Sequence, residues 1–151
     1  MVEVIKEKRT GNEKEFKMPD KCPVCGSSVI RDGAYYRCTG GLACPAQLKR
    51  SITHYASKNA MDIEGLGPKI VDLLVDRGLV KRISDLYRIG IPHLLRLPGF
   101  ALKAARNLVE SIQESKNRSL DRFIYALGIP NVGEHMAKVL AERFKTLDNL
   151  M

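Results

Sequence analysis

The sequence has no tryptophan, and none of its apolar runs approaches the roughly 18 residues that a membrane-spanning helix requires. Its first ten residues, MVEVIKEKRT, contain no apolar segment of the kind found in secretory signals. We therefore expect a cytoplasmic protein that does not interact with membranes. At 151 residues and 44% hydrophobic content, the chain can form one compact domain or two small ones.

Acidic residues are the minority charge: 17 Asp and Glu stand against 25 Lys and Arg, which gives a net charge of +8. The whole excess lies between residues 21 and 118. A basic surface in that part of the chain would suit a polyanion such as nucleic acid. Charge alone leaves an ordinary solvated basic surface equally open.

Two nucleotide-binding motifs are also missing. There is no G-x-x-x-x-G-K-[ST], and Ile70 stands where a dinucleotide-binding fingerprint would need its third glycine after Gly65 and Gly67. No constellation of side chains indicates a catalytic site, so we predict no catalytic residue in this chain.

All four cysteines lie in one stretch, as Cys22-x2-Cys25, twelve intervening residues, and Cys38-x5-Cys44. Two thiolate pairs on tight turns are what a tetrahedral zinc ion requires, and the residues between them resemble a strand, an Asp-Gly turn and a second strand. We predict a zinc ribbon in which four ligands leave zinc no open position, so that the Zn²⁺ is structural. Two disulfides or four ordinary thiols are the alternative.

Three short glycine-containing hairpins recur at intervals of about 33 residues, each between an apolar helical pattern and a helix that carries a lysine. These helices begin without the Ser, Thr or Asp that usually caps the first amides, and a phosphate can bind such amides instead. Each hairpin could also be a plain connector. The residues predicted to bind DNA phosphates are Gly65, Gly67, Lys69, Gly99, Lys103, Gly133 and Lys138.

From about Phe16 onward the sequence resembles the carboxyl-terminal half of bacterial NAD-dependent DNA ligases. The resemblance rests on CPVCGS (22–27), CPAQ (44–47), IEGLG (63–67) and RFIYALGIPNVGE (122–134). It implies a four-cysteine zinc finger followed by a helix-hairpin-helix domain that grips duplex DNA around a nick during replication and repair. In such an enzyme the NAD and Mg²⁺ chemistry belongs to another half, and the K-x-D-G of that half is absent here.

Two departures from the family pattern matter. The second hairpin has Ala101 where the family has glycine, and we expect this alanine to restrict positive φ and weaken that phosphate contact. The sequence also stops before the family's fourth hairpin and BRCT domain. We therefore expect a ligase fragment that is inactive alone and monomeric.

The predicted fold is mainly α, with the zinc ribbon and its β-hairpin followed by an all-α helix-hairpin-helix domain. Residues 1–20 are expected to be the remnant of an OB-fold domain, 21–46 the zinc finger and 47–151 the DNA-binding domain. Helices are predicted near 45–58, 68–77, 83–88, 91–96, 102–116, 119–127 and 133–144. Two other functions stay open: a non-catalytic adaptor of recombination or repair, and a module that binds an acidic protein.

Overall fold

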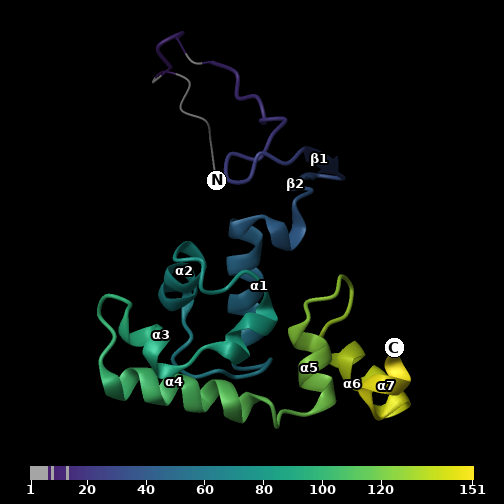
Figure 1. Ribbon diagram of the computed structural model, residues 1–151. Helices are drawn as coiled ribbons and strands as arrows, with labels where there is room; N and C mark the ends of the chain where they lie inside the picture. The colour runs from purple at the N-terminus through teal and green to yellow at the C-terminus, as the bar shows by residue number, and fades with distance from the viewer. Residues whose placement is uncertain (1–6, 8, 13) are drawn as a thin grey trace.

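The computed structural model describes residue 7, residues 9–12 and residues 14–151 (Figure 1). Residues 14–19 form neither helix nor strand. The expectation of an OB-fold remnant over residues 1–20 falls partly on residues 1–6, 8 and 13, which lie outside the described residues. It remains a prediction.

The predicted β-hairpin is present between the two cysteine pairs. Strand β1 (Val29–Asp32) pairs antiparallel with β2 (Tyr35–Cys38), with Val29 opposite Cys38 and Asp32 opposite Tyr35. Gly33 turns the chain at φ 59°, a conformation that glycine adopts without steric cost. The hairpin therefore carries Cys38 back beside the first cysteine pair.

Helices make up the remainder of the fold, as predicted. A short 3-10 turn, η2 (Gly41–Ala43), leads into α1 (Pro45–Ala56). The following elements are α2 (Pro68–Asp76), the 3-10 helix η3 (Ile83–Arg88), α3 (Ile91–Leu95), α4 (Leu102–Ser115), α5 (Leu120–Ala126), α6 (Glu134–Phe144) and α7 (Leu147–Leu150).

Helix α1 ends two residues earlier than expected because Ser57 leaves the helix at ψ 158°. A compact turn follows, in which the amides of Ala60 and Asp62 both donate to the Ser57 carbonyl, at 3.0 and 2.9 Å. Asp62 then adopts φ 51°, which is unusual for a residue other than glycine. This turn, residues 58–62, leads directly into the first glycine hairpin.

The main core lies where α1, α2, η3, α3 and α4 meet. Its fully buried large side chains include Ile52, Leu74, Leu86, Leu94, Leu108 and Ile112. Helices α5 and α6 form a separate pair on the other side of α1 (Figure 1). Ile124 and Ala137 are buried in that pair but do not belong to the main core cluster.

In the described residues, the helices are all too short or too polar to cross a lipid bilayer.

Candidate zinc centre and nucleic-acid interface

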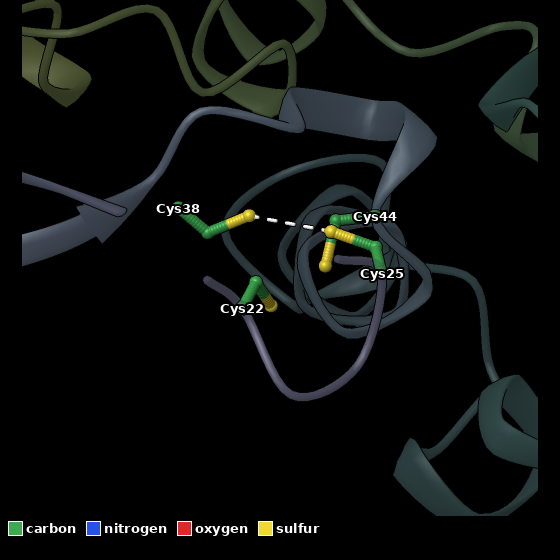
Figure 2. A group of neighbouring side chains, drawn as sticks. All are labelled: Cys22, Cys25, Cys38 and Cys44. Carbon is green, nitrogen blue, oxygen red and sulfur yellow. Dashed lines mark hydrogen bonds between the residues drawn. The ribbon is translucent and has the colours of Figure 1, made fainter. Parts of the chain in front are cut away.

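The four cysteine thiols converge on one point at the start of α1 (Figure 2). Their sulfur atoms all lie within 4.8 Å of one another, and Cys25 Sγ lies 3.4 Å from Cys38 Sγ. A tetrahedral zinc ion with Zn–S bonds of about 2.3 Å requires sulfurs about 3.8 Å apart. All four cysteines are free, so the disulfide alternative is wrong, and the cluster fits a structural Zn²⁺.

Backbone hydrogen bonds shape the two turns that present the thiols. The Cys22 amide donates to the Ser27 carbonyl, and the Gly26 amide donates to the Cys22 carbonyl, each at 2.8 Å. On the second turn the Gly40 amide donates to Cys38 Sγ at 3.3 Å. Such amide–sulfur bonds orient a metal ligand and stabilise its thiolate form.

Gln47 is a supporting residue that sequence reasoning quoted within CPAQ without assigning it a role. Its side-chain amide donates to the Cys38 carbonyl at 2.9 Å and so ties helix α1 to the β-hairpin. Its partner is a backbone atom nine residues earlier, and no residue-type pattern in the sequence marks such a contact.

The four thiols have unequal acidities. Hydrogen bonds from the Ser27 side chain and amide lower the pKa of Cys25 to about 6. The Gly40 amide lowers the pKa of Cys38, but burial and the neighbouring thiols of Cys25 and Cys22 outweigh it and raise that pKa to about 11. A bound Zn²⁺ would hold all four as thiolates and leave no ligand position open for substrate.

The three glycine hairpins share one backbone design. In each, the amide of an apolar residue donates to the carbonyl three residues earlier: Leu66 to Ile63 at 3.3 Å, Phe100 to Leu97 at 3.4 Å and Val132 to Ile129 at 3.0 Å. We call the segments 63–67, 97–101 and 129–133 hairpin 1, hairpin 2 and hairpin 3.

The third residue of each turn has positive φ: Gly65 at 81°, Gly99 at 81° and Asn131 at 66°. A hydrogen bond across four residues with positive φ at the third is the signature of a type II turn, which favours Gly or Asn there. Asn131 was missed from sequence. The Pro-Asn dipeptide that precedes Val132, like the Pro-Gly that precedes Phe100, is the signal that could have revealed it.

The last residue of each hairpin is the N-cap of the next helix. Gly67, Ala101 and Gly133 have φ −77°, −85° and −82°, all in the extended region. The expectation that Ala101 restricts a positive φ is therefore wrong, because positive φ falls on Gly99, two residues earlier. Any L-residue adopts the backbone conformation of Ala101 without strain.

The first amides of these helices lack side-chain caps. Among the residues that the structure describes, no side chain accepts a hydrogen bond from the start of α2, α4 or α6. Three N-termini of this kind each leave N–H donors and a partial positive charge available to an anion.

All seven residues predicted to bind DNA are exposed. Gly65 and Gly99 line one cleft of about 430 Å³ together with Phe100 and Leu108, so hairpins 1 and 2 lie side by side. The Gly65 backbone packs against Leu108, whose Cδ1 lies 3.8 Å from the Cβ that an alanine would have.

Lys138 lies apart from hairpins 1 and 2. It lines a second cleft, of about 630 Å³, with Arg122 and His135, beside the turn 58–62. There the Ser119 hydroxyl lowers the pKa of Asp121 most strongly, and the charge of Lys138 is a smaller cause. The structure thus brings five predicted DNA-binding residues to the neighbourhood of hairpins 1 and 2 and two to hairpin 3.

Three family models match successive parts of the chain. The NAD-dependent DNA ligase C4 zinc finger domain matches residues 21–46, a SAM-like helix-hairpin-helix tandem matches 57–114, and a helix-hairpin-helix motif matches 122–151. The tandem spans hairpins 1 and 2, and the single motif spans hairpin 3.

Similar curated proteins are DNA ligases. The chain is 57% identical over 150 residues to the DNA ligase of Syntrophobacter fumaroxidans, a match that covers 98% of this chain and 22% of that protein. It is 52% identical over 153 residues to the DNA ligases of Thermoanaerobacter pseudethanolicus and Carboxydothermus hydrogenoformans, with 100% of this chain and 23% of each relative covered. The chain thus spans less than a quarter of the length of these relatives.

The zinc-finger match, the tandem and single hairpin motifs and the similarity over nearly every residue agree with one another and with the resemblance found in the sequence. The chain belongs to the NAD-dependent DNA ligase family, as the region that contains its four-cysteine zinc finger and its helix-hairpin-helix elements.

Proposed function

We propose that this region binds duplex DNA without sequence preference, through backbone amides at the starts of α2, α4 and α6. The observation that carries the proposal is the threefold recurrence of one device: a type II turn, an extended N-cap and uncapped amides at an exposed helix start. Amides and lysines contact phosphates rather than base edges, so binding would be indifferent to sequence.

Lysines follow each device and would strengthen it. Lys69 and Lys103 are the second residues of α2 and α4, where a flexible cation can reach the same phosphate that the amides bind. Lys138 lies one turn into α6, and its position beside Asp121 makes its contribution the weakest of the three.

The substrate we propose is nicked duplex DNA, held while a ligase seals the break. Adenylation with NAD and Mg²⁺ would take place on a part of the enzyme outside these 151 residues, since they contain no K-x-D-G. On that reasoning the 151 residues alone bind DNA as a monomer but do not join it. A cytoplasmic location accords with this role.

The zinc site would act indirectly. Cys44 is both a ligand and the N-cap of α1, and α1 packs against α2 and α5. Metal binding worth on the order of 10 kcal/mol would therefore hold the start of the helix that organises the hairpins. The proposal of a non-catalytic adaptor is not favoured, because the similar proteins are DNA ligases.

A salt titration tests the proposed function. Binding to nicked and intact duplexes of scrambled sequence is measured by fluorescence anisotropy, with and without a chelator. Affinity is expected to fall with salt with a log–log slope of about −0.9 for each phosphate neutralised and to be equal across sequences. A flat salt dependence, or a strong preference for one sequence, would contradict it. The protein-interaction alternative predicts no binding of random duplex at low salt.

A further inference from the structure

Two arginines at the start of α5 do not point freely into solvent. Arg118 lies between α4 and α5, and its Nε donates to the Met61 carbonyl at 3.1 Å. Its Nη2 donates to the Asp62 carbonyl at 3.3 Å and pairs with the Asp62 carboxylate at 3.1 Å. Arg118 therefore binds the end of the turn 58–62.

Arg122, on the first turn of α5, binds the beginning of the same turn. Its Nε donates to the Ala60 carbonyl at 2.7 Å, and its Nη2 donates to the Lys58 carbonyl. The two guanidinium groups thus satisfy four backbone carbonyls in a row of five residues. We call these two arginines and the carbonyls they bind the arginine latch.

The latch joins the segments that lead into two different hairpins. The turn 58–62 runs directly into hairpin 1, and α5 runs directly into hairpin 3. Two further contacts span the same junction: His54 Nε2 lies 2.9 Å from the Tyr125 carbonyl, and the Asn59 side chain donates to Glu134 Oε1 at 2.8 Å.

Apolar packing across this junction is limited. Ile124 and Ala137 are buried within the α5–α6 pair but lie outside the main core cluster, which α5 joins through Ala126 and the partly buried Phe123 and Tyr125. Polar contacts, among them the planar forks of two arginines, supply directional links across the junction in addition to this packing.

We propose that Arg118 and Arg122 are positioning residues that fix hairpin 3 relative to hairpin 1, so that both bind the same duplex, and that they act through geometry rather than through their charge. The inference rests on the proposed function. It assigns to both arginines a positioning role in place of a direct contact with phosphate. Each has Nε and one terminal nitrogen bound to carbonyl oxygen.

Rigid linkage matters because it makes the third contact effectively intramolecular. When two binding elements are held in the correct geometry, their joint affinity exceeds that of either one, and a loose linkage loses that gain. Lysine keeps the charge of arginine but cannot span two carbonyls with a planar fork. Arg-to-Lys substitution therefore separates position from charge.

The test uses Arg118→Lys, Arg122→Lys and the double variant, with Arg77→Lys as the matched control. Arg77 is exposed, and no side-chain hydrogen bond or ion pair involves it among the described residues. The double variant is expected to bind duplex DNA about tenfold more weakly at unchanged net charge, because linkage of hairpin 3 is lost. The dissociation constant of the control variant should stay within about twofold of the wild-type value.

A double-mutant cycle with Gly133→Asp distinguishes positioning from a general effect on folding. The aspartate places a carboxylate at the start of α6, where it repels a phosphate at hairpin 3. In the Gly133→Asp background the latch substitutions should weaken DNA binding by less than about twofold, since the hairpin that they orient no longer binds. Equal losses in both backgrounds, or no loss in the wild-type background, would overturn the proposal.

Hydrogen exchange supplies a readout independent of DNA. Amides of α6 should lose protection in the double variant, while those of α2 and α4 keep theirs and zinc remains bound. If neither the wild-type protein nor any variant binds duplex DNA at low salt, the proposed function fails. The protection of the α6 amides then tests by itself whether the arginine latch positions hairpin 3. Unchanged protection of α6 would overturn it.

Discussion

Substituting Ala101 by aspartate should raise the stability of the protein while lowering its affinity for DNA. Ala101 is the N-cap of α4, at φ −85° and ψ 156°, and no side chain within the described residues caps that helix start. An aspartate there can accept hydrogen bonds from the amides two and three residues on, which stabilises a helix by about 1 kcal/mol relative to alanine.

The same carboxylate would occupy the proposed phosphate position. Two like charges about 4 Å apart repel by about 1 kcal/mol in bulk water and about 4 kcal/mol at an effective dielectric constant of 20. At 1.4 kcal/mol per tenfold, the dissociation constant should rise between about fivefold and several hundredfold. The salt slope should also become shallower by about 0.9 as one phosphate contact is lost.

Urea unfolding of the zinc-loaded protein measures the gain in stability. Fluorescence anisotropy with a mixed-sequence duplex at several salt concentrations measures the loss of affinity for DNA. Ala101→Ser tests capping without charge, and Ala101→Gly should leave binding unchanged because the backbone conformation of Ala101 is accessible to both residues. Gly67→Asp repeats the test at hairpin 1, where a Cβ would meet nothing within 4 Å. An aspartate variant that is stabilised yet binds DNA with an unchanged salt slope would refute the anion-receptor model.

Three further predictions concern the zinc site, the hairpin backbone and the core. Gly40→Ala should weaken zinc retention in a chelator competition, because its Cβ would lie 3.1 Å from Cys25 Sγ; undiminished retention would contradict this. Gly65→Ala should lower the free energy of unfolding by about 1 kcal/mol, because alanine is strained at the Gly65 φ of 81°. Gly67 has φ −77°, so Gly67→Ala should lower it by only a few tenths of a kcal/mol. Equal losses in the two variants would argue against backbone strain at Gly65. Burial, and next the hydrogen bond with the Tyr87 hydroxyl, raise the pKa of Tyr55 above its usual value. The stability that this shift contributes is complete below about pH 10 and declines above it, because Tyr55 then ionises in the unfolded chain but not in the folded one. The free energy of unfolding of Tyr55→Phe, measured in urea at several pH values, should lack that decline.

The zinc cluster and the helices were predictable because their determinants are local. Two cysteines on each of two tight turns, with a short hairpin between, leave few alternatives to a tetrahedral site, and the thiols do converge. Apolar residues at helical spacing, interrupted by Gly and Pro, located the helices to within a few residues of their observed ends.

Ala101 shows where local reasoning failed. The sequence indicates that a Gly-Phe-Gly-like hairpin needs one residue at positive φ, but only the backbone shows which one, and it is Gly99. Hairpin 3 has an asparagine at the equivalent place, Asn131, since its side chain tolerates the left-handed region.

The arginine latch lay beyond sequence reasoning altogether. Arg118 and Arg122 bind backbone carbonyls 56 to 64 residues away, and a carbonyl has the same chemistry whatever the residue that bears it. The charge count assigned neither arginine a role: Arg118 ends the basic part of the chain, and Arg122 lies in residues 119–151, which have no net charge. In the folded chain both arginines bind the turn 58–62, which leads into hairpin 1, and Arg122 does so from α5, the helix that precedes hairpin 3.

Among the described residues, α1, α3 and α5 also begin without a side-chain cap, but only α2, α4 and α6 combine that absence with a preceding type II turn and an exposed glycine or alanine as N-cap. This combination requires an explanation, because capping would stabilise the fold. Thr146 caps α7 by accepting from the Asn149 amide at 3.3 Å, and Asp85 accepts the amides of Lys81 and Arg82 ahead of η3. At α2, α4 and α6 the N-cap is glycine or alanine. Each such position forgoes a few tenths to about 1 kcal/mol in a protein whose total stability is expected to be about 5 to 15 kcal/mol. A ligand that binds the folded state and fills all three positions would return that stability in the complex, and phosphate is the anion that such exposed, uncapped helix starts suit best.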